Sequence, residues 1–377
     1  MERITILQFT DPICVWCWGN EPVLRAIEYL YGDKVRIEFI MGGLVEDIST
    51  LYDIRGEKAD IIERANQIIT KNWLIASQKH GMPVVDTGLK LFSERYPSSF
   101  PQNIAYEAAK RVNPLQAKRF LRLMREATFI HGRRTSQIDV ILDLATQAGY
   151  NAAAFIDEYT TGNAHADFMQ DRMLCRRNGI TGFPSYLVRN DDTEIIIGGY
   201  QNLNTFHTLI KRLSAGRIKP RRIGPSVANM MNFAERYHSI YPVDIEVLFG
   251  LDRHQTNLMI SQEITSGRLT AEPVGESLRL TPNKIVAEHP RRHSSKAKKE
   301  HTMKRIAILC LSAILLLTLF ACGDGSRSYS YYEFVCEGDM TVTHGSAAAA
   351  ASSAACAAFT SNSAPGLSGM MESVSLS

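Results

Sequence analysis

The feature that most constrains this chain is a pair of cysteines at C-x-x-C spacing, Cys14 and Cys17, which directly follows the apolar run Ile4 to Phe9. Residues 21–30 have helical periodicity, so the pair lies between a predicted strand and a predicted helix. A thiol at a helix N-terminus faces unpaired backbone N–H groups and the positive end of the helix dipole, which stabilise a thiolate. The thiolate attacks disulfides, and the second cysteine lies near enough to close the ring and release the product.

The alternative for such a pair is half of a zinc site. A structural zinc ion needs four ligands. The globular region has no second C-x-x-C pair and no H-x-x-x-H pair to supply the others. We therefore predict redox chemistry, with neither a bound metal nor a cofactor.

The cellular compartment bears on the same question. The N-terminus runs straight into a strand, without the pattern of a secretory signal, so we expect residues 1–290 to be cytoplasmic. Thiols are kept reduced there, and a C-x-x-C pair is more often catalytic than a structural bridge.

The order of predicted elements places this motif in a divided α/β domain. Strands at 3–10 and 35–41 flank the helix and make a βαβ unit, and a β hairpin followed by a helix at 204–214 resumes after residue 180. We assign residues 1–55 and 180–216 to this domain. The intervening segment 56–179 is a predicted helical insertion, with helices at 57–79, 102–112, 115–130, 136–148, 151–161 and 164–178.

Pro184 stands immediately before the first strand of that hairpin, at 186–188. Proline cannot donate to a β ladder, so its position needs a reason. A cis peptide in a tight loop beside the thiols is one reason. An ordinary trans proline that opens an edge strand is the other.

Residues 226–285 are predicted to form a small separate module after a linker at 215–225. Three short helices at 228–238, 243–249 and 253–266 precede a two-stranded wing, so the segment resembles a winged helix. Such a module binds nucleic acid or a protein partner, or it docks on the core of the protein. The net charge of +3 is small, and Glu263 accompanies Arg253 and His254, so we favour docking and consider nucleic-acid binding unlikely.

Residues 291–377 form a tail of a different kind. A basic stretch is followed by an apolar run at 306–321 and by Cys322, which resembles a bacterial lipoprotein signal. Either a neighbouring reading frame is joined to this one, or the run is a short membrane anchor, although its 16 residues are fewer than the roughly 17–25 of a typical span. We predict disorder for the low-complexity end.

The motif and this order of elements together resemble one family. Segment 11–18 reads DPICVWCW, and segment 181–185 reads TGFPS. Over residues 3–214 the chain resembles the DsbA-like branch of the thioredoxin superfamily, and within it the cytosolic FrnE-type members. The resemblance implies an α/β fold, that is, a thioredoxin fold with a large inserted helical domain, here followed by the winged-helix-like module. It also implies a cis Phe183–Pro184 bond.

The resemblance further implies the roles of site residues. Cys14 is the attacking thiol, nearer to solvent, and Cys17 is the resolving thiol, partly buried. The backbone of Phe183, just before Pro184, binds an extended substrate segment. Since the dipeptide between the cysteines contributes no positive charge, we expect only a moderate lowering of the Cys14 pKa.

Trp16 and Trp18 complete the predicted substrate site. Both tryptophans are expected to line an apolar substrate surface. Simple packing beneath the helix is an equally good interpretation of Trp18.

One position departs from the family. Many relatives carry a buried acid on the first strand to take the proton of the resolving thiol, whereas this chain has Gln8 there. Asp11 and Glu38 are substitutes only if they are not capping or solvent-facing carboxylates, so the proton acceptor stays unassigned. Cys175 is either a further redox partner or, as we favour, a buried free cysteine.

Three functions fit these observations. The first is a thiol–disulfide oxidoreductase acting on protein or peptide thiols and disulfides, with thioredoxin or glutathione as its redox partner. The alternative is a non-catalytic adaptor of DsbA-like fold, because similar proteins deliver a regulator to a bacterial protease. A glutathione-dependent isomerase or transferase is the third, but those relatives carry serine where this chain has Cys14.

Overall fold

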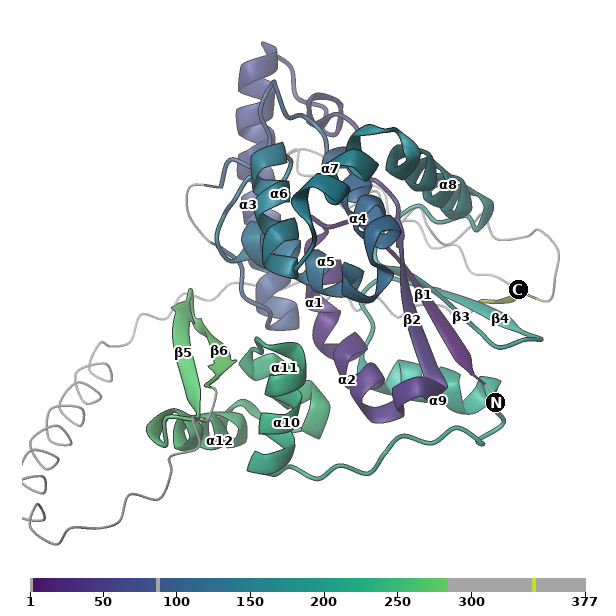
Figure 1. The fold of residues 1–377 in the computed structure, drawn as a ribbon, viewed down its shortest axis with the longest axis vertical. Coiled ribbons are helices and arrows are strands. Elements are labelled where there is room, and N and C mark those ends of the chain that lie inside the picture. Colours follow the sequence, from purple (N-terminus) through teal and green to yellow (C-terminus); the bar gives the residue numbers. More distant parts are fainter. Residues whose placement is uncertain (1–2, 86–88, 284–340, 344–377) are drawn as a thin grey trace, which may run out of the picture. The chain divides into compact units, whose positions relative to one another are not determined.

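The computed structural model describes residues 3–85, 89–283 and 341–343. A mixed sheet runs through the molecule in the order β2-β1-β3-β4-β7 (Figure 1). Strands β1 and β2 are parallel, and the remaining neighbours are antiparallel. The strands are β1 (Ile4–Thr10), β2 (Val35–Met41), β3 (Ser185–Arg189), β4 (Glu194–Gly198) and β7 (Thr341–Thr343).

The predicted βαβ unit and hairpin are therefore present. Helices α1 (Val15–Gly19) and α2 (Glu21–Tyr31) connect β1 to β2, and α9 (Leu203–Leu213) follows the hairpin. Two single turns of 3-10 helix, Gly32–Lys34 and Ile48–Thr50, flank β2. The strand β7 lies within the tail, where we predicted no strand, and the other tail residues lie outside the described part of the chain.

The segment between β2 and β3 is helical, as predicted. Asn113 caps the third of its helices by accepting a hydrogen bond from the N–H of Leu115 at 3.1 Å, and Pro114 occupies the first turn. Asn151 likewise accepts from the N–H of Ala154 at 3.0 Å. The helices are α3 (Lys58–His80), α4 (Phe100–Val112), α5 (Pro114–Phe129), α6 (Ile138–Ala148), α7 (Ala152–Thr160) and α8 (Asn163–Arg177).

The C-terminal module has the predicted winged-helix order. A backbone hydrogen bond of 3.0 Å from Ile240 to Leu280 ties the second strand of the wing to the loop before the second helix. Its elements are α10 (Val227–Tyr237), α11 (Pro242–Phe249), α12 (Arg253–Thr265), β5 (Leu269–Val274) and β6 (Ser277–Pro282).

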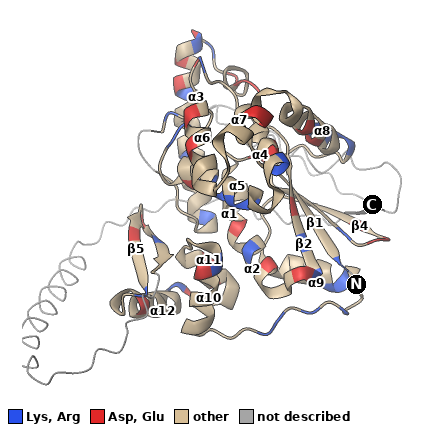
Figure 2. Ribbon diagram, viewed as in Figure 1, with Lys and Arg blue, Asp and Glu red and all other residues tan. Residues whose placement is uncertain are grey.

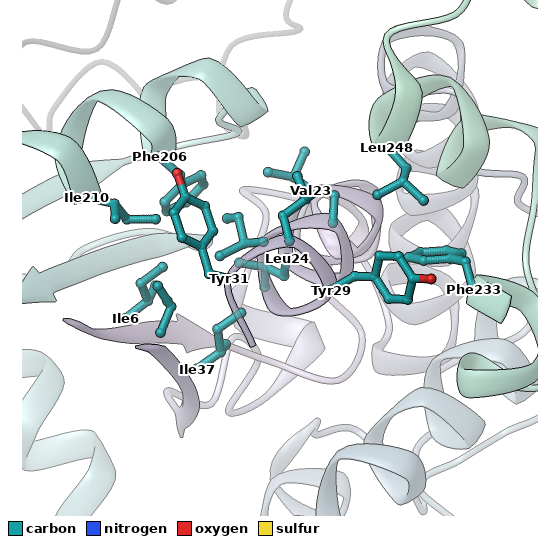
Figure 3. Packing of buried hydrophobic residues seen from close by; sticks show 14 of the residues in the cluster. Ile6, Val23, Leu24, Tyr29, Tyr31, Ile37, Phe206, Ile210, Phe233 and Leu248 are labelled. Atoms are coloured by element: carbon teal, nitrogen blue, oxygen red, sulfur yellow. The ribbon is translucent and has the colours of Figure 1, made fainter. Parts of the chain in front are cut away.

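This module packs on α2 of the thioredoxin-like domain. Phe233 of α10 meets Tyr29 of α2 edge to face, with ring centroids 5.1 Å apart (Figure 3). Leu248 of α11 belongs to the same buried cluster. The Arg25 guanidinium of α2 donates to the carbonyl of Ser239 at 3.0 Å. These contacts favour the docking interpretation.

The charges of the module support the same view. Arg253 forms an ion pair with Glu246, and Arg268 with Glu263 at 2.6 Å. The helix α11 carries only acidic charges, Asp244 and Glu246, and α12 carries one lysine-or-arginine charge and one acidic charge, Arg253 and Glu263 (Figure 2). Nucleic-acid binding therefore gains no support from this surface.

Two expectations for the tail cannot be compared with the structure. The apolar run 306–321 and Cys322 lie outside the described residues. Among the helices that are described, none is long and apolar enough to cross a membrane.

Candidate active site

The two cysteines of the motif lie where the first strand passes into the first helix. Cys14 is the N-cap residue of α1, and its Sγ accepts a hydrogen bond of 3.2 Å from the backbone N–H of Cys17. Neither cysteine is in a disulfide in this structure. The predicted position at a helix N-terminus is confirmed, and the first helical turn directs an N–H group at the Cys14 sulfur.

The loop before β3 covers this pair. The Phe183–Pro184 peptide bond is cis, as the resemblance implied. Cys14 Sγ lies 3.5 Å from the carbonyl oxygen of Phe183, to which its thiol donates. Cysteines and proline loop, which are about 170 residues apart in the chain, therefore meet at one site.

The prediction that Cys14 is nearer to solvent holds only weakly. Its side chain is 3% exposed, compared with 0% for Cys17. Burial raises the pKa of Cys14, so the expected moderate lowering is wrong for this reduced pair. Burial also opposes ionisation of Cys17, but the neighbouring Cys14 side chain and the positive charge of Arg125 outweigh it and lower the pKa of Cys17.

The carboxylates that we considered as proton acceptors have other partners. Asp11 is buried and accepts hydrogen bonds from the N–H groups of Ile13 and Leu44 and from two side chains of the insertion, Ser99 and Asn103. It thus fixes the loop before the motif. Burial nevertheless raises its pKa above the ordinary value.

Glu38 and Gln8, the other two positions considered for the proton acceptor, have different surroundings. Glu38 forms an ion pair with Arg36 in a partly exposed position on β2. Gln8 is buried and donates to the hydroxyl of Tyr186 at 3.1 Å. These contacts favour the capping and solvent-facing interpretations.

The two tryptophans of the motif have different surroundings. Trp18 is completely buried, donates from Nε1 to the carbonyl of Pro83 at 2.9 Å and stacks on Phe129. This environment fits the packing interpretation and leaves no face of Trp18 for a substrate. Trp16 is partly exposed and lies beside His80 and Tyr200, with ring centroids 5.8 and 6.2 Å away.

His80 and Tyr200 were not predicted, because neither is part of a motif. His80 comes from the end of α3, is 3% exposed, and burial lowers its pKa to about 3, so its ring is neutral. Its Nδ1 accepts from the N–H of Met82 at 3.1 Å. Together with Trp16 these rings form an aromatic wall next to the motif.

Cys175 lies apart from the exchange chemistry. It packs in an apolar cluster with Phe9 and Leu187, and burial raises its pKa to about 12. A thiol in this state is a poor nucleophile. Among the described residues, no group of three or more histidine, cysteine or acidic side chains is placed to hold a metal ion.

The sequence reasoning did not identify a buried arginine that binds the end of the first strand. Thr10 ends β1, and Arg125 reaches it from α5 in the insertion. No local motif marks Arg125, which is 0% exposed although arginine is seldom fully buried.

A mixed sheet, a helix that begins at a C-x-x-C pair and a cis-proline loop against the first cysteine define a thioredoxin-fold protein. The chain belongs to the thioredoxin family, whose family model, described as Thioredoxin, matches residues 7–208. The predicted superfamily and α/β class are thereby confirmed.

Curated relatives and solved structures are similar over different lengths. The chain is 23% identical to the ClpXP adapter protein SpxH of Halalkalibacterium halodurans over 72% of this chain and 87% of that protein. It is 19% identical to SpxH of Bacillus subtilis over 66% and 79%. The cytosolic disulfide reductase DsbM from Pseudomonas aeruginosa is 22% identical, with a TM-score of 0.43 over 56% of this chain and 97% of DsbM.

Proposed function

We propose that the protein is a thiol–disulfide oxidoreductase that acts on protein or peptide substrates through Cys14 and Cys17. The observation that carries the proposal is the placement of Cys14 Sγ between the Cys17 N–H group at 3.2 Å and the Phe183 carbonyl oxygen at 3.5 Å. The contact with the Cys17 N–H group stabilises negative charge on the sulfur, and the contact with Phe183 places the sulfur beside the backbone of the cis-proline loop. An extended substrate segment that binds this backbone brings its disulfide next to Cys14.

The reaction has two steps. The Cys14 thiolate attacks one sulfur of a substrate disulfide, which forms a mixed disulfide and releases a substrate thiolate. The Cys17 thiolate then attacks the Cys14 sulfur, which forms the Cys14–Cys17 disulfide and releases the second substrate thiolate. Two electrons pass to the substrate, whose thiolates take up protons. Reduced thioredoxin or glutathione then reduces the Cys14–Cys17 disulfide. The reverse sequence oxidises a substrate dithiol and leaves Cys14 and Cys17 as thiols, which oxidised thioredoxin or glutathione disulfide converts back to the disulfide.

The test is a titration of the full-length protein in glutathione redox buffers, followed by tryptophan fluorescence. Trp16 and Trp18 flank Cys17, so their emission should change when the disulfide forms. We expect a single two-electron transition that is lost in both Cys14→Ser and Cys17→Ser variants. The midpoint assigns the direction, since a potential near that of the cytosolic pool fits a reductase and a more oxidising one fits an oxidase. A wild-type signal identical to that of the serine variants would contradict the proposal.

The second candidate function is a protease adaptor that uses the fold as a binding surface. It is favoured by the curated relatives, which are named ClpXP adapter protein SpxH and match more of this chain than the thioredoxin segment alone. The two functions separate in the Cys14→Ser/Cys17→Ser double variant. If the chain is an adaptor, the double variant should still bind purified ClpXP, as measured by calorimetry. Its disulfide exchange activity should be absent.

The cytoplasmic location remains part of this proposal. It carries over the sequence-based expectation for residues 1–290 and does not rest on any described helix. Protein partners are implied by both candidate functions.

A further inference from the structure

One face of α3 carries basic and apolar side chains in alternation. Four residues follow one another at spacings of four, three and four positions and therefore lie on one side of the helix: Arg64, Ile68, Lys71 and Ile75. These four residues are here called the α3 stripe. Arg64 and Lys71 are exposed, and Ile75 is 53% exposed. The stripe therefore lacks the uniformly polar character of a solvated helix face.

The packing of α3 turns this face outward. Ile62, Ile69 and Trp73, on the other side of the helix, are buried in one apolar cluster. Ile54, in the loop that precedes α3, is partly buried and packs against the same cluster. The core of the protein therefore fixes both the loop and the orientation of the α3 stripe.

A surface hollow of about 480 Å³ lies between this loop and the α3 stripe. Arg55 lines it from the loop, and Arg64 and Lys71 line it from α3, with Ile68 between them. Among the described residues on its wall, Asp53 is the only acidic one. Three positive charges and one negative charge thus face a single small space.

These three cations are not neutralised within the described part of the chain. Elsewhere an arginine on an exposed helix face has counter-charges, as Arg111 has in Glu158 at 2.6 Å. By contrast, Arg55, Arg64 and Lys71 form neither an ion pair nor a hydrogen bond through their side chains with any described residue. Like charges gathered in one hollow repel one another, so anionic groups from another molecule are attracted there.

The spacing of the α3 stripe matches a helix better than a strand. Arg64 and Lys71 are separated by about 10.5 Å along the axis of α3. A second helix has the same rise, so its acidic residues at i and i+7 reach both cations while an apolar residue at i+4 reaches Ile68. Side chains on one face of a strand recur about every 6.7 Å, which does not match the spacing of the two cations.

We propose that the α3 stripe, together with Arg55, is a docking surface for an acidic amphipathic helix of a protein partner. The inference goes beyond the proposed function, because it concerns binding rather than disulfide exchange. The same helix α3 ends at His80, whose ring lies 5.8 Å from that of Trp16 in the aromatic wall. A partner that binds along α3 is therefore held next to the C-x-x-C motif.

A nucleic acid fits this surface less well. Nucleic acids carry a phosphate at every nucleotide and bind surfaces that are strongly positive, often with aromatic rings on which bases stack. Here isoleucines alternate with the cations, and Asp53 faces the same hollow. This pattern favours a partner in which carboxylates alternate with apolar side chains.

The test measures binding of a designed peptide to the full-length Cys14→Ser/Cys17→Ser protein by fluorescence anisotropy, so that disulfide exchange does not contribute. The probe is a labelled peptide of about 20 residues, long enough to form a helix, in which glutamate and leucine alternate at four- and three-residue spacing. A peptide of the same composition in scrambled order is the reference. We expect the designed peptide to bind about tenfold more tightly or better. Equal affinities would overturn the proposal.

Reversing the charges on α3 should weaken this binding. Adding Arg64→Glu/Lys71→Glu should lower the affinity about tenfold or more, and a peptide with lysine in place of glutamate should then bind this variant better than the unreversed protein. Both side chains are exposed, so the melting temperature should stay unchanged. The matched control is Lys34→Glu/Lys211→Glu, which changes the net charge equally at two exposed lysines on other elements. An equal loss of affinity in the control would overturn the proposal.

Two further measurements separate a docked helix from attraction between charges alone. Ile75→Ser keeps every charge and should lower the affinity about threefold or more, because it removes apolar contact area. A single-stranded DNA oligonucleotide should compete only weakly with the designed peptide. An unchanged affinity of Ile75→Ser, or equally strong competition by the oligonucleotide, would overturn the proposal. Because the tested protein lacks both motif cysteines, either result leaves the proposed exchange function to be decided by its own redox titration.

Discussion

The buried carboxylates of two groups in this molecule have pKa values that are shifted in opposite directions. The first, here called the α5 ion cluster, consists of Glu21, Arg122, Arg125 and Glu126. The second, the α4–α8 carboxyl pair, consists of Glu107 and Asp171. Glu21, Glu126 and Glu107 are all buried, so burial alone does not distinguish the groups.

In the α5 ion cluster opposite charges alternate. Arg122 donates to Glu126 at 2.9 Å and pairs with Glu21, which also binds Arg125. Burial alone would raise the pKa of Glu21, but the two guanidinium groups lower it to about 2. The same balance lowers the pKa of Glu126.

In the α4–α8 carboxyl pair like charges meet. Burial and the neighbouring Asp171 raise the pKa of Glu107 to about 8, against the opposing effect of Lys110 at 2.7 Å. Asp171 accepts from the N–H of Met41 at 2.7 Å, which stabilises its charged form and leaves the proton on Glu107. The sign of the shift is therefore decided by the neighbours of each carboxylate.

Removing the charge of Glu21, which Arg122 and Arg125 share, should disrupt the α5 ion cluster and cause the largest loss of stability. Glu21→Gln leaves two buried guanidinium groups without a full counter-charge, and breaking such a buried pair costs about 3–5 kcal/mol. Urea unfolding at neutral pH should show this loss in the free energy of unfolding.

The control for this variant lies on the same helix. Glu28→Gln removes the charge of a partly exposed pair with Lys118 and should cost about 1 kcal/mol or less. Equal losses in the two variants would mean that the α5 ion cluster stabilises the fold no more than a surface pair does.

Neutralising Glu107 in the α4–α8 carboxyl pair should instead stabilise the folded protein. Because the folded pKa of Glu107 lies above its unfolded value, its contribution to stability is complete below about pH 4.5 and is lost as the pH rises through about 8. Glu107→Gln has no such loss, so its advantage over the wild type should grow between these values, by about 1 kcal/mol or more at pH 8.

Other titratable groups face Glu107, so the quantity compared is the difference in unfolding free energy between the wild type and Glu107→Gln at each pH. Lys110 and Tyr106 are present in both proteins, whereas Asp171 titrates together with Glu107, so the difference between the two proteins reports on the carboxyl pair. Thermal or urea unfolding at several pH values gives the two profiles. Parallel profiles would show that Glu107 is ionised in the folded protein and would remove the contrast with Glu21.

The fold could be predicted from the sequence because short local patterns mark its helices, strands and turns. Asn113 and Asn151 cap helices, and Gly81 and Gly149 end helices at positive φ of 76° and 94°. The cysteines, Pro184 and the flanking strands are similarly marked by short patterns. The strand β7 lies in low-complexity sequence, which carries no such signal.

The site was only partly accessible, because burial and pairing are set by tertiary structure. Arg125 lies 115 positions from Thr10, and its helix shows many charges that sequence reasoning takes as solvent-facing. Cys14 is nearer to solvent than Cys17 by only a small margin, since the Phe183 loop covers it. Trp18 could not be distinguished from Trp16 until Phe129 and the Pro83 carbonyl were found around it.

The smallest effect should come from an ion pair that is neither buried nor shared. Arg189 of β3 faces Glu194 of β4 directly across the strands, with Nη1 3.2 Å from Oε1 and about half of each side chain exposed. Water already solvates both charges, so Arg189→Ala should change the free energy of unfolding by less than about 1 kcal/mol, and by still less in high salt. The measurement is the same urea unfolding at low and high salt. A loss comparable to that of Glu21→Gln would show that pairing alone, rather than pairing in the absence of water, separates the α5 ion cluster from the α4–α8 carboxyl pair.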